Sequence, residues 1–411
     1  MKSHSRFDVS KFNLMIATYN EATPERNLPE VSSYEHFCAA YPVTDREFLR
    51  SAGEDLLKRG QLTGCYIVST SGTTSTPVVM ANRIWKNPTD DSYPRQFYNF
   101  ISENIFRSED VIANLFFPGG FGLLYEGACR FLEPTGATIL PIGRMDSFQN
   151  DRPHFQLFQR LGLNTLIGSP SSIVEFARNS AQFSVNINIR KVVFSSEAFY
   201  PSKREYIRSI WPAASFYSLY GATEFGLACV GLPTFETNRH HLFEDWFVVE
   251  VDNDDNLYIT DLKGPLVPII RYRIGDRGSL VSLPDGSSQL ELRGRSDNAF
   301  NCGGALIKFE TIVQKIRHAG VSVHADDRNI QLILRSGESG QDQMDIVLDL
   351  DISENSEIAK SVLAEVSSIK EISEDIRRGA VQLNVLGRDK IHTSRRSKRP
   401  AVVDLREISA I

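Results

Sequence analysis

The sequence TLIGSPSS, at residues 165–172, begins the pattern that decides the fold class. The apolar run predicts a short buried strand, and Ser171 or Ser172 is expected to cap the helix that follows. The pattern then repeats, because KVVF (191–194) predicts a strand, residues 202–210 a helix, and SFYSLY (215–220) a further strand. Such alternation favours an α/β fold with a largely parallel sheet covered on both faces.

The residues before this pattern add helices and two strands. Residues 1 to about 60 are polar with apolar residues at helical spacing, and Gly60 is a plausible helix end. CYIV (65–68) predicts a short buried strand, and ATILP (137–141) predicts another. Between them, residues 95–135 predict two helices that flank the loop FPGGFG (117–122).

From residue 245 the pattern changes to short strands separated by turns. The turns are NDDN (253–256) and PDG (284–286), and the expected strands are residues 247–251, 257–260, 278–281 and 290–292. This order predicts a small antiparallel subdomain or barrel. After GRSD (294–297), the expected elements are a helix (309–318), two strands (329–335, 344–350), a helix (354–369) and a strand (380–386), which together suit a small α+β domain.

Composition excludes several classes of protein. The 411 residues carry 45 Lys+Arg and 51 Asp+Glu, a net charge of −6, so nucleic acid is not an expected partner. No apolar run approaches the ~20 residues of a membrane span, and no membrane association is expected. The polar N-terminus lacks the apolar core of a signal peptide, which predicts a cytoplasmic protein. The five cysteines show neither metal-ligand spacing nor a disulfide framework.

The loop TSGTTSTP (70–77) follows the strand expected at 65–68 and is rich in hydroxyl groups. Its side chains and backbone N–H groups could wrap an anion, and Gly72 allows close backbone approach. It is not a Walker A loop, because the GxxxxGK[ST] pattern is absent. An ordinary Ser/Thr-rich connection is the alternative when the loop is taken alone.

Four later segments favour the anion-binding interpretation of this loop over an ordinary connection. They are YGATE (220–224), RYRIGD (271–276), GRSD (294–297) and SKRPAVVDLR (397–406). With the loop, they resemble the [ST]SG[ST]TGxP, YGxTE, RYRTGD, GRxD and lysine-bearing tail motifs of the adenylate-forming (ANL) superfamily, in its phenylacetate-CoA ligase-like branch. The five segments follow the order of that family over residues 63–406.

The resemblance implies two domains. Residues 1–296 would form a large N-terminal adenylation domain, with mostly parallel sheets, helices and a small antiparallel β subdomain. Residues 297–411 would form a small, mobile α+β C-terminal domain with Asp297 as its hinge. In the family's motif Lys398 matches the catalytic lysine, and Gly304 matches a small residue that lines the thioester channel.

The resemblance also implies a reaction. An ATP-dependent ligase would convert a carboxylic acid to an acyl-AMP, release pyrophosphate, and transfer the acyl group to CoA. The alternative acceptor is an amine, an amino acid or a carrier protein, as in secondary-metabolite pathways such as phenazine-type antibiotic biosynthesis. A homologue that binds the nucleotide or the acid without turnover is the third hypothesis. Members of the superfamily are often dimers, so a homodimer is considered.

By the same resemblance, one group of residues would handle phosphate. Thr223 would donate to the α-phosphate, and Glu224 would coordinate Mg²⁺, which prefers carboxylate and phosphate oxygens. Ser75 and Thr76 stand where the family has Gly and often Lys. The residues expected to cradle the β- and γ-phosphates are Thr70, Ser71, Gly72, Thr73 and Thr74.

A second group would bind the nucleoside and the acid. Asp276 would accept hydrogen bonds from the ribose hydroxyls, and Arg295 would lie near the ribose or α-phosphate. Further nucleotide contacts are expected from Ser196, Glu197, Ala198, Ser218, Tyr220 and Gly221. Aromatic and small side chains at the expected acyl pocket favour a flat aromatic acid. The residues expected there are Phe121, Gly122, Ser195, Tyr220 and Ala222.

Overall fold

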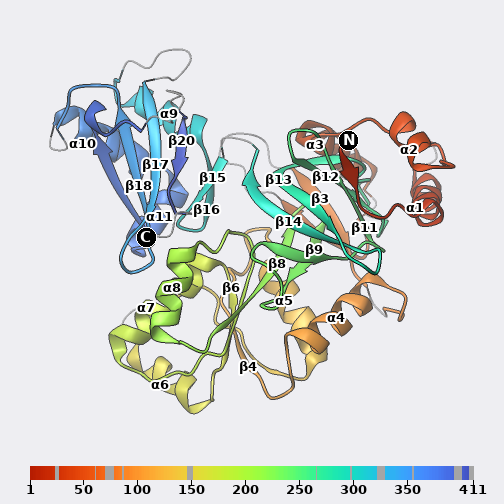
Figure 1. The fold of residues 1–411 in the computed structure, drawn as a ribbon, viewed down its shortest axis with the longest axis horizontal. Coiled ribbons are helices and arrows are strands. Elements are labelled where there is room, and N and C mark those ends of the chain that lie inside the picture. The colour runs from red at the N-terminus through yellow and green to blue at the C-terminus, as the bar shows by residue number, and fades with distance from the viewer. Residues whose placement is uncertain are drawn as a thin grey trace. The chain divides into compact units, whose positions relative to one another are not determined.

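A computed structural model (Figure 1) describes most of the chain. The chain forms two compact units. Unit 1 is Met1–Asp110, Phe117–Pro141 and Phe216–Asp297, and unit 2 is Val111–Phe116, Ile142–Ser215 and Asn298–Ile411. The described residues are 1–23, 27–60, 62–69, 78–85, 88–145, 151–264, 266–296, 299–321, 329–353, 356–392 and 400–406. Each unit is described by itself.

Residues 1–60 of unit 1 are largely helical, as expected, and their helices follow a short strand at Ser3–His4. The helices are α1 (Val9–Ala22), α2 (Tyr34–Ala40) and α3 (Arg46–Arg59). Asp8, Ser33 and Asp45 cap their N-termini by accepting backbone N–H groups of the first turn. Gly60 ends α3 in the left-handed region, with φ of +68°. The expected helix end is therefore confirmed.

An antiparallel sheet follows in unit 1. It begins earlier in the chain than residue 245, because β8 already pairs with β9, and β10 joins β9 to β14. In spatial order the strands are β1 (Ser3–His4), β11 (Phe247–Val251), β12 (Asn256–Asp261), β13 (Tyr272–Ser282), β14 (Ser288–Arg295), β10 (Arg239–Leu242), β9 (Gly226–Gly231) and β8 (Ser215–Ala222). The antiparallel part is thus larger than its pattern indicated.

Two strands of unit 1, one before and one after residues 70–77, form a hairpin. Strand β2 (Cys65–Ser69) pairs antiparallel with β3 (Val79–Arg83), a strand that the sequence analysis did not predict. Of the residues in β2 only Val68 is fully buried, so the expectation of a buried strand was wrong. The remaining elements of this part are α4 (Tyr93–Asn104), α5 (Leu124–Leu132), a short 3₁₀ helix η1 (Glu133–Thr135) and β5 (Thr138–Leu140).

The parallel strands lie in unit 2. Strand β6 (Thr165–Gly168) pairs in parallel with β4 (Val111–Asn114) and with β7 (Lys191–Phe194). The associated helices are α6 (Arg152–Arg160), α7 (Pro170–Phe183) and α8 (Pro201–Ile210). The cap of α7 is Ser169, which accepts the N–H of Ser172, so the expected caps Ser171 and Ser172 were wrong. Pro170 at the first helical position makes Ser169 the cap.

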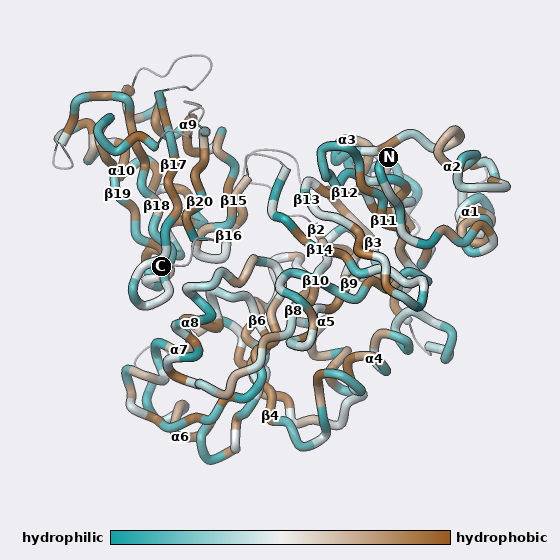
Figure 2. Tube along the Cα trace, in the orientation of Figure 1, coloured by the Kyte–Doolittle hydropathy of each residue, from teal (hydrophilic) through white to brown (hydrophobic). Residues whose placement is uncertain are grey.

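The rest of unit 2 is the expected small α+β fold. A hairpin of β15 (Ala299–Cys302) and β16 (Ala305–Lys308) precedes a four-stranded sheet of order β19-β18-β17-β20. Hydrophobic residues run along β17 and β18 (Figure 2) and are buried beneath the helices. The elements are α9 (Phe309–His318), β17 (Ile330–Ser336), β18 (Asp342–Leu348), α10 (Glu357–Ser367), α11 (Lys370–Arg377), β19 (Val381–Leu386), η3 (Arg388–Lys390) and β20 (Val402–Asp404).

The fold class is therefore α/β, with a large sheet and a smaller sheet domain. Among the described residues, no helix has both the length and the hydropathy needed to span a membrane. All five cysteines are free thiols, and Cys229 and Cys302 are buried.

Candidate active site

Strand β8 has, one residue before its end, a position where only glycine fits. A Cβ on Gly221 would lie 2.1 Å from the carbonyl oxygen of Gly226, because β8 and β9 approach closely beside a register shift at Tyr220 and Gly221. The hairpin then presents Ala222 half-buried and Thr223 exposed. The tight turn therefore holds the YGATE segment at a strand end, where Thr223 is exposed and Glu224 is partly exposed.

Tyr220, Asp276 and Arg295 form one constellation in unit 1. Tyr220 Oη donates to Asp276 Oδ2 at 2.7 Å, and Arg295 Nη1 donates to Asp276 Oδ1 at 2.9 Å. Asp276 and Arg295 are opposite each other on β13 and β14. Burial, together with the carboxylate of Asp276, raises the pKa of Tyr220 well above its ordinary value. Tyr220 therefore stays a neutral donor, and the Asp276 side chain, 17 % exposed, remains open to a ligand.

A second tyrosine–carboxylate pair lies in the same unit. Tyr272 Oη donates to Glu224 Oε1 at 3.0 Å, and burial raises the pKa of the Tyr272 phenol. No role was predicted for Tyr272, although it lies inside the RYRIGD segment. It orients a carboxylate that the sequence analysis assigned to Mg²⁺.

The surroundings of Glu224 fit a cation that is held jointly by the protein and substrate phosphates better than one enclosed by protein ligands alone. The described residues contain no group of three His, Cys, Asp or Glu side chains that could enclose a metal ion. Mg²⁺ commonly takes one or two carboxylates and completes its shell with phosphate oxygens and water. A single oriented carboxylate at the end of a strand meets that requirement, so Glu224 would hold Mg²⁺ together with substrate phosphates.

Two other predicted residues of unit 1 have defined environments. Ser218 Oγ lies 3.0 Å from Nε2 of the buried His240, so its hydroxyl is held within the sheet. Phe121 has φ of +58° in the loop after β4 and is 66 % exposed. Its carbonyl accepts the N–H of Ser69 at 3.1 Å, which places Phe121 and Gly122 beside the end of β2. An exposed aromatic ring in a strained loop is available to a ligand.

Unit 2 contains the segment from Ser195 to Ala198 directly after β7. Ser195 is buried, and Ser196 has φ of +72°, a left-handed conformation that turns the chain sharply. The Glu197 side chain accepts from Ser171 Oγ at 2.8 Å, and it points into a polar network rather than into solvent. A contact between this segment and adenine therefore stays a prediction. Because the Glu197 side chain is engaged elsewhere, the backbone of the segment is the better candidate for that contact.

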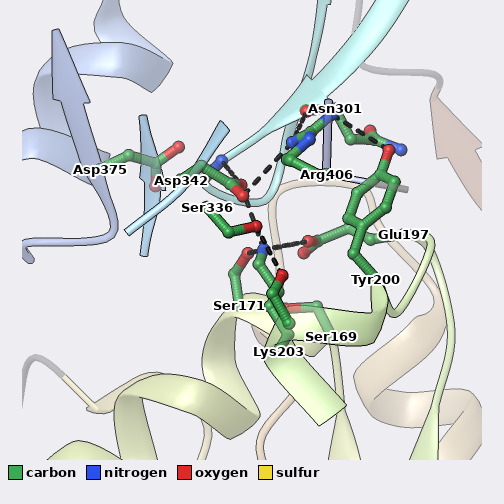
Figure 3. A network of polar contacts seen from close by, with 12 residues as sticks. Ser169, Ser171, Glu197, Tyr200, Lys203, Asn301, Ser336, Asp342, Asp375 and Arg406 are labelled. Atoms are coloured by element: carbon green, nitrogen blue, oxygen red, sulfur yellow. Dashed lines mark hydrogen bonds and ion pairs between the residues drawn. The ribbon is translucent and has the colours of Figure 1, made fainter. Parts of the chain in front are cut away.

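That polar network has a buried lysine at its centre (Figure 3). Lys203 Nζ lies 3.1 Å from Asp342 Oδ2 and 3.3 Å from Ser171 Oγ. Asp342 is also 3.3 Å from Arg406 Nη1, and Arg406 donates to Tyr200 Oη at 3.0 Å. Sequence reasoning gave Lys203 no role. The signal was the i, i+4 spacing of Lys203 and Ile207, which puts both on the buried face of α8.

Several predicted residues lie outside the described part of the chain. They are Thr70, Ser71, Gly72, Thr73, Thr74, Asp297 and Lys398. Their roles remain predictions from the resemblance.

Comparisons with known proteins agree with this picture. No family model matches the chain. The indoleacetate–lysine synthetase of Pseudomonas savastanoi is 27 % identical over 301 residues, which cover 69 % of this chain and 71 % of the relative. A crystal structure of 2-hydroxyisobutyryl-CoA ligase, in complex with 2-HIB-AMP and CoA, has a TM-score of 0.65 at 15 % identity and covers 98 % of this chain and 91 % of its own.

In sequence and in fold this chain is therefore similar to adenylate-forming ligases. The amide bond synthetase McbA of Marinactinospora thermotolerans has the same fold, with a TM-score of 0.50 at 15 % identity over 82 % of this chain and 68 % of its own. The expectation of an adenylate-forming ligase is confirmed. Assignment of this ligase to the phenylacetate-CoA ligase-like branch remains a prediction.

Proposed function

We propose that this ligase activates a carboxylic acid with ATP and then transfers the acyl group to an amine. In the first step a carboxylate oxygen attacks the α-phosphorus, an acyl-AMP forms, and pyrophosphate leaves. In the second step the amine nitrogen attacks the acyl carbon, AMP leaves, and the nitrogen loses a proton. The observation that carries the proposal is the Asp276 carboxylate, held by Tyr220 and Arg295 inside two of the matched motifs.

Asp276 is suited to bind the ribose. A carboxylate has about four lone-pair positions, and the donors from Tyr220 and Arg295 fix its orientation. Two vicinal hydroxyl groups can then donate to a group that is already in place, which lowers the entropic cost of binding. Arg295 supplies positive charge beside the same position, where it would favour the α-phosphate.

Glu224 and Thr223 would act on the phosphates. When bound, Mg²⁺ supplies positive charge that neutralises the phosphate oxygens and the leaving pyrophosphate. Glu224 is oriented for this role by the 3.0 Å hydrogen bond from Tyr272. Thr223 is exposed next to it and would donate its hydroxyl to the α-phosphate. Thr70–Thr74 and Lys398 complete the proposed set by resemblance alone.

An aromatic acid is the proposed substrate class. The exposed Phe121 ring and the Tyr220 ring offer aromatic surface, and Gly122 and Ala222 leave room beside them. The 27 % identical relative is named for indoleacetate, an arylacetic acid. Ser195 stays a predicted contact of the acyl group.

The proposal also names the molecule that accepts the acyl group. An amine is favoured because the relative that matches over 301 residues is an indoleacetate–lysine synthetase. CoA is the second candidate, since Gly304 matches the small residue of the thioester-forming members and is exposed here. The fold similarity to a CoA ligase at 15 % identity is compatible with either acceptor.

The test is acid-dependent ATP–pyrophosphate exchange with Mg²⁺, using benzoic, phenylacetic, indoleacetic, hydroxycinnamic and polycyclic aromatic acids. Exchange with an arylacetic acid supports adenylation, and lysine, other amines and CoA are then added separately to identify the acceptor by mass spectrometry. Lys398→Ala should abolish exchange, with Lys390→Ala, on the exposed η3 helix, as a matched control. ATP binding without exchange across the whole panel would favour the non-catalytic homologue.

A further inference from the structure

Arg271, directly before Tyr272 in the RYRIGD segment, makes a buried ion pair to which the sequence analysis gave no role. Its side chain is 9 % exposed, and that of its partner Glu250 is 1 % exposed. Arg271 Nε lies 3.0 Å from Glu250 Oε2 and Nη2 lies 3.0 Å from Oε1, so the contact is bidentate. Tyr34 Oη donates to the same carboxylate at 2.7 Å. The guanidinium is therefore fixed in one orientation.

The remaining nitrogen of this guanidinium binds the end of helix α2. Arg271 Nη1 donates to the carbonyl of Cys38 at 3.2 Å and to that of Tyr41, the C-cap residue, at 2.9 Å. The last carbonyls of a helix have no partner within the helix, and an arginine nearby can satisfy them. Arg271 therefore fixes the chain at the point where it leaves α2.

The chain that leaves α2 then pairs with Tyr272. The N–H of Thr44 donates to the carbonyl of Arg271 at 3.0 Å, and the N–H of Arg273 donates to the carbonyl of Thr44 at 2.9 Å. Thr44 and Tyr272 thus form an isolated parallel bridge. Both peptide groups that flank Tyr272 are held by Thr44, a residue outside all five motifs. The segment fixed by Arg271 therefore sets the backbone from which the Tyr272 side chain extends.

The backbone of Arg271 is itself strained. Its φ of +49° lies in the left-handed region, which is unfavourable for a residue with a Cβ. The N–H of Arg271 donates to Thr260 Oγ1 at 2.9 Å, so the neighbouring strand β12 also holds this conformation. The next residue, Tyr272, then reaches Glu224 with its phenol, 3.0 Å from Oε1. Backbone strain that is held by several contacts is found mostly at functional sites.

We propose that Arg271 is a positioning residue for the carboxylate that holds Mg²⁺. Its buried ion pair and its contact with the end of α2 fix Tyr272, and the Tyr272 phenol in turn orients Glu224. Residues 34–44 thereby belong to the support of the site. This inference rests on the proposed function, in which Glu224 holds Mg²⁺ together with substrate phosphates. Arg271 acts through Tyr272 and touches no substrate.

The first experiment measures cation binding in an Arg271→Lys variant of the full chain. Lysine keeps the charge but cannot make the bidentate contact or reach both helix carbonyls with one planar group. Mn²⁺ serves as the probe, and its binding in the presence of ATP is followed by electron paramagnetic resonance. The dissociation constant should rise about tenfold, as for loss of an outer-shell partner, and the Mg²⁺ concentration at half-maximal exchange should rise with it. Arg293→Lys, at an exposed ion pair of the same unit, is the matched control and should change neither.

A double variant separates positioning from a general structural effect. Tyr272→Phe removes the hydroxyl through which Arg271 is proposed to act. In that background Arg271→Lys should weaken Mn²⁺ binding by less than about twofold further, because residues that act through one contact are not additive. Full additivity of the two substitutions would overturn the proposal, since Arg271 would then affect the site without Tyr272.

Cation binding also separates this inference from the proposed reaction, because it requires no turnover. If no acid supports exchange but Arg271→Lys still weakens Mn²⁺ binding, the proposed function fails and the positioning role stands. Unchanged Mn²⁺ affinity in folded Arg271→Lys, or no Mn²⁺ binding with ATP by the unsubstituted chain, would overturn the role. If Arg271→Lys fails to fold, Thr44→Val replaces it, which keeps the side-chain shape but removes the hydroxyl that donates to the Ile270 carbonyl at 2.8 Å. The same dependence on Tyr272 is expected from that variant.

Discussion

Two aspartates, one in each unit, show how similar contacts can serve different ends. Asp276 lies between Arg295 and a tyrosine, and Asp342 lies between Lys203 and Arg406. The Asp276 side chain is 17 % exposed, whereas that of Asp342 is 1 % exposed. Partial exposure leaves the first carboxylate available to a ligand, and full burial commits the second to its partners. The difference predicts loss of activity in one case and loss of stability in the other.

The largest effect is expected from Asp276→Asn. The amide keeps the size of the side chain but loses the charge that pairs with Arg295 and accepts ribose hydroxyls. We expect kcat/KM for ATP in pyrophosphate exchange to fall by about 10³-fold, as for loss of a charged, oriented contact in an active site. Circular dichroism and thermal melting should stay near those of the unsubstituted chain.

The control for Asp276→Asn is Asp90→Asn, because the Asp90 side chain is 97 % exposed in the same unit. It should leave exchange unchanged. A much lower melting temperature of Asp276→Asn, together with a normal rate of pyrophosphate exchange by the folded variant, would show that Asp276 serves stability and not activity.

Asp342→Asn should act on stability. It removes the negative charge that pairs with Lys203 and Arg406, while the amide oxygen can still accept the Gly303 N–H, which is 2.8 Å from Asp342 Oδ2. Breaking a buried ion pair by removing one member costs about 4 kcal/mol of unfolding free energy. Urea unfolding of the full chain, followed by tryptophan fluorescence and circular dichroism, measures the loss. Lys360→Met, which removes an exposed charge, is the reference. If Asp342→Asn lowers the unfolding free energy no more than Lys360→Met does, burial of the Asp342 ion pair does not determine the effect.

Asp375 adds a pH dependence to the same unit. Burial raises the pKa of its carboxyl from 3.8 to about 7, against the opposing effect of Arg378, with Glu197 adding to the rise and Arg144 opposing it. Since the folded state binds this proton more tightly, its stabilisation is complete below about pH 4 and is lost as pH rises through about 7. A pKa difference of one between the folded and unfolded states corresponds to about 1.4 kcal/mol, so the shift from 3.8 to about 7 corresponds to a change in unfolding free energy on the order of 4 kcal/mol.

Asp375→Asn should flatten that dependence. The variant should match the unsubstituted chain in urea midpoint near pH 4 and exceed it near pH 8. Parallel curves between these two pH values would show that Asp375 is ionised throughout.

The comparison also shows what a sequence can reveal. Asp276 and Arg295 lie 19 residues apart in recognisable segments, and the strand pairing of β13 with β14 brings them together as expected of neighbouring strands. Lys203, Asp342 and Arg406 are separated by 139 and 64 positions, so no local pattern joins them. Their proximity depends on how α8 packs on a separate sheet. Long-range polar contacts of this kind follow only from the tertiary structure.

Local patterns predicted most elements of the fold and failed where the pattern is ambiguous. The helix at 309–318 and the strand at 191–194 were predicted with the bounds that the structure shows. Strands β9 and β10 were missed, since GLACVG begins and ends with glycine and RHHL contains only one apolar residue. Their pairing with β8 and β14 supplies the backbone hydrogen bonds that their own sequences do not signal.

The smallest effects should come from the two tyrosines, which separate the two carboxylates of unit 1. Tyr220→Phe removes the donor to Asp276, and Tyr272→Phe removes the donor to Glu224. Each loss of a hydrogen bond to a charged group costs about 1.5 to 3 kcal/mol, or roughly tenfold to a hundredfold. Tyr220→Phe should raise KM for ATP with little change in the Mg²⁺ requirement. Tyr272→Phe should raise the Mg²⁺ concentration at half-maximal exchange and leave KM for ATP at saturating Mg²⁺ nearly unchanged. Equal changes of both parameters in both variants would mean that Asp276 and Glu224 act as one group, because each tyrosine would then influence both carboxylates.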